Sequence, residues 1–176
     1  MNLLLIGLRG SGKTTIGRLL ATRLALPFVD LDDLTTRHLG CATTGEAFTK
    51  FGEARFRDAE GIALATALSR PGQVVALGGG TPTGLGIAEM LRRERDAGRV
   101  RIVYLAAEAE TLRRRLAATD MTQRPSLTGV DPLVEIEAVL NRRDGLYREL
   151  AEAVVETDAM TPEEAAAEVV GELGLG

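Results

Sequence analysis

Short apolar segments alternate with longer amphipathic segments along most of the chain. The short segments are apolar almost throughout, which is typical of strands buried on both faces. They predict strands over Asn2–Ile6, Phe28–Asp30, Val74–Leu77, Arg101–Leu105 and Ala153–Val155. Between them, apolar residues recur at helical spacing. This spacing predicts helices over Thr14–Ala25, Gly52–Ser69, Gly84–Ala97, Glu108–Ala117, Pro132–Ala151 and Pro162–Leu173.

The alternation predicts an α/β fold, in which a five-stranded parallel sheet carries helices on both faces as a three-layer sandwich. Ligands of such sheets bind outside the carboxyl ends of the strands. This rule places Gly7, Asp30–Asp32 and Gly78–Gly80, which follow the first three strands, around one crevice. We expect one domain over residues 1–176. Two segments interrupt the alternation: a helical insert at 34–51 and a polar segment at 118–131, which predicts a loop.

The segment from Gly7 to Thr14 fits the pattern G-x-x-x-x-G-K-[ST]. Between a strand and a helix, this pattern is typical of the phosphate-binding loop of P-loop NTPases. Its glycines let backbone N–H groups approach phosphate oxygens, and the helix N-terminus adds partial positive charge. We expect Lys13 to reach the β- and γ-phosphates of a nucleotide and the Thr14 hydroxyl to bind Mg²⁺. The alternative is a glycine-rich turn that only caps a helix.

Composition narrows the function classes. The net charge of −4 argues against a general nucleic-acid surface, and an aromatic content of 3% argues against a base-stacking platform. One cysteine and one histidine leave no intrachain disulfide and disfavour multi-histidine metal sites. No apolar run approaches membrane-spanning length, and the N-terminus lacks the basic region of a signal peptide. We therefore expect a cytoplasmic protein that binds neither nucleic acid nor membrane, and a monomer, since no apolar patch suggests a dimer.

Two aspartates at the end of the second predicted strand are candidates for chemistry. Asp30 could hold Mg²⁺ through water, and Asp32 could accept a proton from a substrate hydroxyl or orient that hydroxyl. The alternative is that Asp32 or Asp33 only caps the next helix. Beside a phosphate-binding loop on a parallel sheet, the functional interpretation is favoured.

Gly78-Gly79-Gly80 follows the third predicted strand, and three glycines permit a ligand to approach the backbone closely. The alternative is a plain turn. Arg57, in a segment that contains half of the aromatic residues, could pair with a substrate carboxylate as a bidentate fork. Glu60 lies one turn further on and could orient it. By periodicity alone, a surface ion pair between these two residues is the favoured interpretation.

Two further arginines are candidates for anion binding. Arg124 in the polar segment could swing over a nucleotide and stabilise developing charge; the alternative is a solvated loop arginine. Arg142 and Arg143 share a predicted helix with Tyr147, and one of them could hold an anion. The alternative there is a solvated helix face.

Together these motifs resemble those of shikimate kinases, small P-loop kinases of the nucleoside-monophosphate-kinase-like fold. The P-loop is common to many families, but the ordered combination G-E-x-x-F-R-x-x-E, G-G-G, R-P and R-x-x-x-Y is far more specific. The resemblance implies transfer of the γ-phosphate of ATP to the 3-hydroxyl of shikimate, giving shikimate 3-phosphate and ADP. It places the reaction in aromatic amino-acid biosynthesis, with Mg²⁺ as the cofactor.

The resemblance also assigns roles to individual residues. The implied catalytic residues are Lys13, Asp32 and Arg124, with Asp32 as the candidate base. The implied ATP-binding residues are Gly10, Ser11, Gly12, Lys13, Thr14, Thr15 and Arg124. The implied shikimate-binding residues are Asp32, Phe48, Phe56, Arg57, Glu60, Gly78, Gly79, Gly80 and Arg143. Thr14 would bind Mg²⁺ directly and Asp30 through water. A substrate-binding region is implied at about 32–60 and a lid at about 118–131.

The chain departs from the family pattern at a few positions, among them Thr81-Pro82-Thr83 after the glycine triplet. Two other functions stay open: a kinase of another small acceptor, such as gluconate or a nucleoside monophosphate, and a nucleotide-binding switch without catalysis. A nucleobase acceptor would need a stacking or amide-lined pocket, whereas Arg57 with an acidic neighbour suits a small acid. A switch would not need Asp32, Arg57 and Arg143 to converge.

Overall fold

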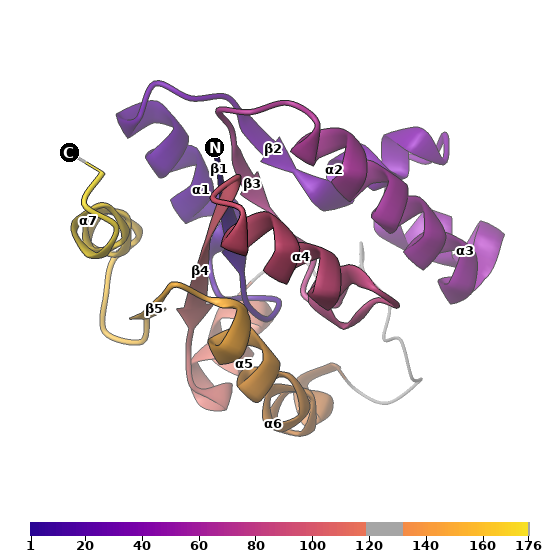
Figure 1. Ribbon diagram of the computed structural model, residues 1–176. Helices are drawn as coiled ribbons and strands as arrows, with labels where there is room; N and C mark the ends of the chain where they lie inside the picture. The colour runs from indigo at the N-terminus through magenta and orange to yellow at the C-terminus, as the bar shows by residue number, and fades with distance from the viewer. Residues whose placement is uncertain (119–131, 176) are drawn as a thin grey trace.

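The computed structural model of the protein describes residues 1–118 and 132–175 (Figure 1). Its strands are β1 (Asn2–Ile6), β2 (Phe28–Asp30), β3 (Val74–Ala76), β4 (Val100–Ala106) and β5 (Ala153–Glu156). Its α-helices are α1 (Lys13–Arg23), α2 (Leu31–His38), α3 (Thr44–Leu68), α4 (Ile87–Asp96), α5 (Ala109–Ala117), α6 (Pro132–Leu150) and α7 (Pro162–Glu172). A 3₁₀ turn, η1 (Thr81–Thr83), follows β3.

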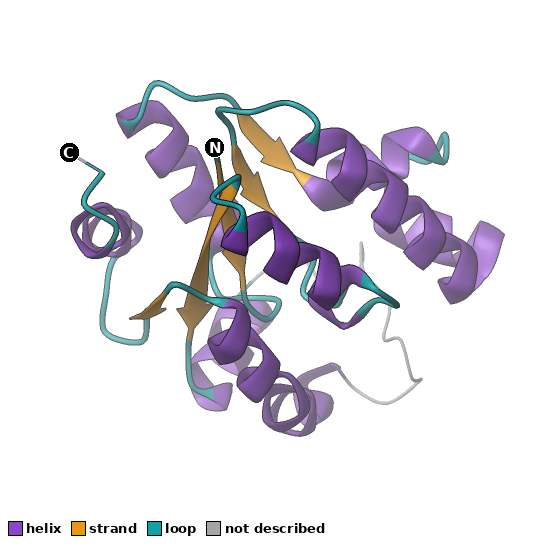
Figure 2. Cartoon of the chain, viewed as in Figure 1, coloured by secondary structure: helices purple, strands orange, loops and turns teal. Residues whose placement is uncertain are grey.

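The five strands form one parallel sheet in the order β2-β3-β1-β4-β5, which confirms the predicted fold class. Figure 2 shows the sheet between helices on both sides. Neighbouring strand residues point to opposite faces: Leu5 packs with α1 and α7, whereas Leu4 packs with α3, α4 and α6. Because β1 is buried along its whole length at the centre of the sheet, the loop that follows it leaves from a rigid support.

The segment between β2 and β3 differs most from the prediction. The expected insert at 34–51 is α2 plus the first part of α3, and α3 continues into the helix predicted over Gly52–Ser69. Gly52 breaks the helical geometry with φ 75° and ψ 170°, so α3 is kinked there. A straight helix would separate Phe48 from Phe56 by about 12 Å. Instead their rings stack with centroids 4.5 Å apart, because the kink folds the two parts of α3 toward each other.

One other boundary shifts for a local reason. The helix predicted over Gly84–Ala97 begins only at Ile87, because Gly86 adopts φ 71° and the residues before it belong to the η1 turn and its exit. The last helix begins at Pro162 as predicted, and Thr161 caps it through a capping box with Glu164. Within the described ranges, no helix is long and apolar enough to cross a membrane.

Candidate active site

The glycine-rich segment after β1 wraps around the N-terminus of α1. Gly7, Gly10 and Gly12 have φ values of 146°, 86° and 93°, which residues with a side chain rarely adopt. A Cβ at Gly7 would also lie 2.6 Å from the carbonyl oxygen of Leu105 and 2.8 Å from the Ser11 hydroxyl. The loop can therefore close this tightly only because glycine occupies these positions, as the phosphate-binding motif requires.

The contacts of two side chains of this loop indicate that it binds an anion. The Lys13 ammonium donates to the carbonyl oxygens of Gly7 at 2.9 Å and Leu8 at 2.8 Å, which holds it across the loop. The Ser11 hydroxyl is buried and has no hydrogen-bond partner among the described residues. A buried polar group without a partner costs about 1–3 kcal/mol. A ligand that bonds to Ser11 would remove this cost.

A hydrogen bond between two side-chain oxygens joins the first turn of α1 to the end of β2. The Thr14 hydroxyl donates to Oδ2 of Asp30 at 2.8 Å, while Oδ1 of Asp30 accepts the backbone N–H of Asp32 at 3.1 Å. Asp30 is therefore the cap of α2, and the interpretation of Asp32 or Asp33 as the cap was wrong. The reason is that α2 follows β2 without an intervening loop, so the last strand residue takes the cap position.

The Thr14 hydroxyl and the Asp30 carboxylate together are suited to bind a magnesium ion. A hydroxyl and a carboxylate are the hard oxygen ligands that Mg²⁺ prefers, and Mg²⁺ usually completes its shell with phosphate and water. Among the residues that the structure describes, no group of three or more His, Cys, Asp or Glu could hold a metal ion. Thr14 and Asp30 are thus suited to a metal that arrives with a nucleotide.

Two adjoining cavities open at this edge of the sheet. The first, of about 570 Å³, is lined by the whole loop from Gly10 to Thr15 and extends past α1 to Thr157 and Pro162. The second, of about 190 Å³, lies between α3 and α6. Asp32, Gly78 and Gly79 line both cavities. A group bound in the second cavity therefore lies next to the phosphate-binding loop of the first.

The glycine triplet is packed against charged side chains. A Cβ at Gly78 would lie 2.7 Å from a carboxylate oxygen of Asp32 and 2.7 Å from one of Glu60. A Cβ at Gly80 would lie 2.7 Å from the guanidinium of Arg57. The interpretation as a plain turn does not explain this packing. Glycine is required because the backbone itself forms one wall of the second cavity.

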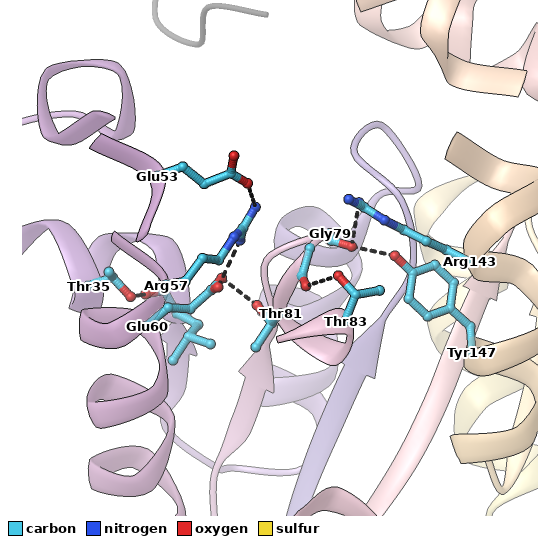
Figure 3. A network of polar contacts seen from close by, with 11 residues as sticks. Thr35, Glu53, Arg57, Glu60, Gly79, Thr81, Thr83, Arg143 and Tyr147 are labelled. Atoms are coloured by element: carbon cyan, nitrogen blue, oxygen red, sulfur yellow. Dashed lines mark hydrogen bonds and ion pairs between the residues drawn. The ribbon is translucent and has the colours of Figure 1, made fainter. Parts of the chain in front are cut away.

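Arg57 and Glu60 form an ion pair on α3, which forms the neighbouring wall of the second cavity, with 2.8 Å between Nη1 and Oε2 (Figure 3). Glu60 is only 3% exposed, so the prediction of an ordinary surface pair was wrong. The error arises because η1 covers this face of α3, and the periodicity of one helix carries no information about its neighbours. The guanidinium also lies 5.8 Å from the ring centroid of Phe56 and 6.0 Å from that of Phe48.

On the side of the second cavity opposite α3, two side chains of α6 donate hydrogen bonds to one carbonyl group of the glycine triplet. Arg143 donates to the carbonyl oxygen of Gly79 at 3.0 Å, and the Tyr147 hydroxyl donates to the same oxygen (Figure 3). Burial raises the pKa of Tyr147, so it stays protonated and remains a donor. Arg142, by contrast, is exposed. The alternative that these arginines lie on a solvated helix face is therefore correct for Arg142 and wrong for Arg143.

Comparison with known proteins gives an independent finding. The family model described as shikimate kinase matches residues 9–174. The chain is 38% identical over 173 residues to the shikimate kinase of Symbiobacterium thermophilum, which covers 98% of this chain and 96% of that protein. The chain belongs to the shikimate kinase family. The shikimate kinase of Oleidesulfovibrio alaskensis is 41% identical over 174 residues, with 96% of this chain and 92% of that protein covered.

Solved structures of the family agree with the fold. A shikimate kinase from Acinetobacter baumannii, determined in complex with shikimate, superposes with a TM-score of 0.87 at 34% identity. The superposition covers 99% of this chain and 92% of that chain. The predicted resemblance to the shikimate kinase family is therefore confirmed over nearly the whole length.

The structure brings most of the predicted site residues together. The first cavity is lined by Gly10, Ser11, Gly12, Lys13, Thr14, Thr15, Asp30 and Asp32. The second is lined by Asp32, Phe48, Phe56, Arg57, Glu60, Gly78, Gly79, Gly80 and Arg143. Arg124 lies outside the described residues, as does the predicted lid apart from Ala118, which is the C-terminal cap of α5.

Sequence reasoning missed the far end of the first cavity. There Arg115 of α5 donates to the hydroxyl of Thr157 at 2.9 Å and to its carbonyl oxygen at 2.5 Å. Thr157 follows β5, and Pro162 begins α7 nearby. The signal was available, because these residues lie beyond the carboxyl end of the fifth strand. The rule that ligands bind at the carboxyl ends of parallel strands covers the fifth strand as well as the first three.

Proposed function

We propose that the protein is a shikimate kinase, which transfers the γ-phosphate of ATP to the 3-hydroxyl of shikimate and releases shikimate 3-phosphate and ADP. The carrying observation is that the two cavities share Asp32, Gly78 and Gly79. An acceptor in the second cavity would place a hydroxyl beside a phosphate held by the loop. Membership of the family and the shikimate complex of the Acinetobacter baumannii protein support shikimate as that acceptor.

The first cavity would hold ATP. Phosphoryl transfer needs little covalent work from the protein, so positioning and charge stabilisation dominate. Gly10, Ser11, Gly12 and Thr15 would surround the phosphates, and Lys13 would leave its carbonyl partners to reach the transferred group. The Thr14 hydroxyl and, through water, Asp30 would hold Mg²⁺, which neutralises phosphate charge when bound. Arg124 as a further phosphate ligand stays a prediction.

The second cavity would hold shikimate, whose carboxylate and hydroxyl groups match its lining. Arg57 and Arg143, from opposite walls, would bind the carboxylate, and Phe48 and Phe56 would pack beside the ring. Gly78, Gly79 and Gly80 would contact the hydroxyl groups. Asp32 would accept the 3-hydroxyl proton or orient that hydroxyl toward the γ-phosphate. Glu60 would hold Arg57 in place.

The lining of the two cavities is less suited to the competing functions, a kinase of another small acceptor or a nucleotide-binding switch without catalysis. The second cavity is small, at about 190 Å³, and its cations Arg57 and Arg143 suit a carboxylate better than a nucleobase. A nucleotide-binding switch would not require Asp32 at the junction of the cavities.

We also propose a single domain over 1–176 in which residues at about 32–60 form the substrate-binding region and those at about 118–131 form the lid. Closure of such a lid would exclude water and suppress wasteful hydrolysis of ATP. A monomeric state and a cytoplasmic location stay predictions from the sequence.

Product analysis tests this function. Purified protein with Mg-ATP and shikimate is expected to release one ADP for each shikimate consumed. Phosphorus–proton coupling in the nuclear magnetic resonance spectrum of the product is expected to place the phosphate on carbon 3. Phosphate on another hydroxyl, or ADP released without loss of shikimate, would contradict the proposal.

Replacing Arg57 by alanine is expected to raise the KM for shikimate by about 100-fold, since losing one partner of a charge-assisted pair costs about 2–5 kcal/mol. The KM for ATP should change less than about twofold, because Arg57 lines the second cavity and not the first. Steady-state kinetics with each substrate varied in turn separates the two constants.

Two further variants control this experiment. Arg55→Ala removes an exposed arginine two residues earlier on α3 and should change neither constant. Arg57→Lys keeps the charge but loses the planar fork, so an intermediate KM is expected. Thermal unfolding must accompany these assays, because Arg57→Ala leaves the buried Glu60 without its cation. An unchanged shikimate dependence would reduce Arg57 to a structural ion pair.

A further inference from the structure

Thr81, the residue directly after the glycine triplet, is one of the few buried polar side chains among the residues that the structure describes. It is 1% exposed, and its hydroxyl donates to Oε1 of Glu60 at 2.5 Å. Thr81 is absent from the linings of both cavities. Figure 3 shows it beneath the Glu60 carboxylate, with Arg57 on the other side. The Thr81 hydroxyl is therefore connected to the second cavity through Glu60, which does line it.

The two oxygens of the Glu60 carboxylate have different partners. Oε2 accepts from Arg57 at 2.8 Å, and Oε1 accepts from Thr81. A buried carboxylate is costly unless it is paired and hydrogen-bonded on both sides. One bond would leave the carboxylate free to rotate, whereas bonds to both oxygens fix its plane. Arg57 also pairs with the exposed Glu53 at 3.5 Å, so Glu60, at 2.8 Å, is the closer and the buried one of the two carboxylates that hold the guanidinium.

The backbone around Thr81 makes its hydroxyl a rigid donor. The N–H of Thr81 donates to the carbonyl oxygen of Gly78 at 3.1 Å, and its own carbonyl accepts the N–H of Gly84 at 3.0 Å. Pro82 restricts the chain at the next position. Thr81 is thus fixed to the glycine triplet, while Glu60 and Arg57 belong to α3. The hydrogen bond joins two separate walls of the second cavity.

We infer that Thr81 is a positioning residue for acceptor binding, which holds the Glu60 carboxylate and thereby aims the Arg57 guanidinium at the acceptor carboxylate. This role rests on the proposed function, because the acceptor carboxylate is that of shikimate. The Thr81 side chain lines neither the nucleotide cavity nor the second cavity. Its loss should therefore weaken shikimate binding and leave ATP binding and the transfer step unchanged.

Thr81→Val tests the inference, because valine keeps the branched shape and removes only the donor. We expect the KM for shikimate to rise about tenfold, which corresponds to about 1.4 kcal/mol, while kcat and the KM for ATP change less than about twofold. Thr81→Ser restores the hydroxyl and should return the KM for shikimate to within about twofold of the original. Thr66→Val is a matched control, since Thr66 is an exposed threonine of α3, the helix that carries Arg57 and Glu60, and its hydroxyl donates to the carbonyl oxygen of Ile62.

An Arg57→Ala background shows whether Thr81 acts through Arg57. In that background, Thr81→Val should change the KM for shikimate less than about twofold, because the Arg57 guanidinium that Thr81 positions is absent. A tenfold effect in that background would overturn the inference, as would an unchanged KM in the single variant. A parallel fall of kcat, ATP affinity and melting temperature would indicate a merely structural role and would also overturn it. If valine prevents folding, Thr81→Ala gives the same comparison.

The unmodified protein in the same assay separates this inference from the proposed function. No shikimate-dependent ADP from the unmodified protein would overturn the proposed function itself. An active unmodified protein with an unchanged Thr81→Val variant would overturn only the role of Thr81.

Discussion

Replacing Lys13 by alanine is expected to lower kcat by about three orders of magnitude while the fold stays intact. The ammonium lies across the phosphate-binding loop, held by the carbonyl oxygens of Gly7 and Leu8. Lys13 lines the first cavity, where the phosphates of ATP would lie. Removing one preorganised donor to developing charge typically costs a factor of about 10²–10³ in kcat. The upper end is expected because Lys13 carries a full positive charge.

The chain offers a matched control, because its other lysine, Lys50, is exposed on α3. Lys50→Ala should leave kcat within about twofold. The measurement is ADP release under saturating Mg-ATP and shikimate for both variants, with thermal unfolding to verify folding. Near-normal turnover of Lys13→Ala would contradict the assignment of the loop as the phosphate site.

Replacing Asp32 by asparagine is expected to lower kcat by about a thousandfold. General-base catalysis contributes about 10²–10⁴, and Asp32 is the carboxylate that lines both cavities. Asparagine keeps the size of the side chain and removes its charge. The backbone N–H of residue 32 can still donate to the cap residue Asp30, so α2 should form normally. The KM values for both substrates should change much less than kcat.

Asp33→Asn is the control for this variant, since Asp33 is the exposed neighbour of Asp32 in the first turn of α2. It should leave kcat within about twofold. Single-turnover measurements of phosphoryl transfer at saturating substrate isolate the chemical step from product release. A loss below about tenfold for Asp32→Asn, or an equal loss for both variants, would remove Asp32 from the reaction.

Local patterns were sufficient to predict the sheet and the loop. The uninterrupted apolar run Leu3-Leu4-Leu5-Ile6 has the character of a strand buried on both faces, and the loop motif follows it directly. The carboxyl-end rule then places Asp30, Asp32 and the glycine triplet at one edge without any knowledge of packing. These predictions succeeded because each depends on residues close together in sequence.

The parts that sequence reasoning could not reach depend on contacts between distant segments. The bond from Tyr147 to the carbonyl group of Gly79 joins residues 68 positions apart. Glu60 is on a polar-looking helix face, and it is buried there against the η1 turn and the glycine triplet. Gly52 was expected to begin a helix, yet its left-handed φ creates a kink that brings Phe48 onto Phe56. The pattern of apolar residues within a single helix or strand cannot predict such contacts.

The most direct test of the central claim is ADP production with Mg-ATP and different acceptors. Shikimate is compared with gluconate, a panel of nucleoside monophosphates, and no acceptor. The two-cavity site predicts a shikimate-dependent rate far above all the others, and that rate should be lost in the Lys13→Ala and Asp32→Asn variants. A folded protein that binds ATP but gives the same rate with and without shikimate would contradict the assignment of the second cavity to shikimate.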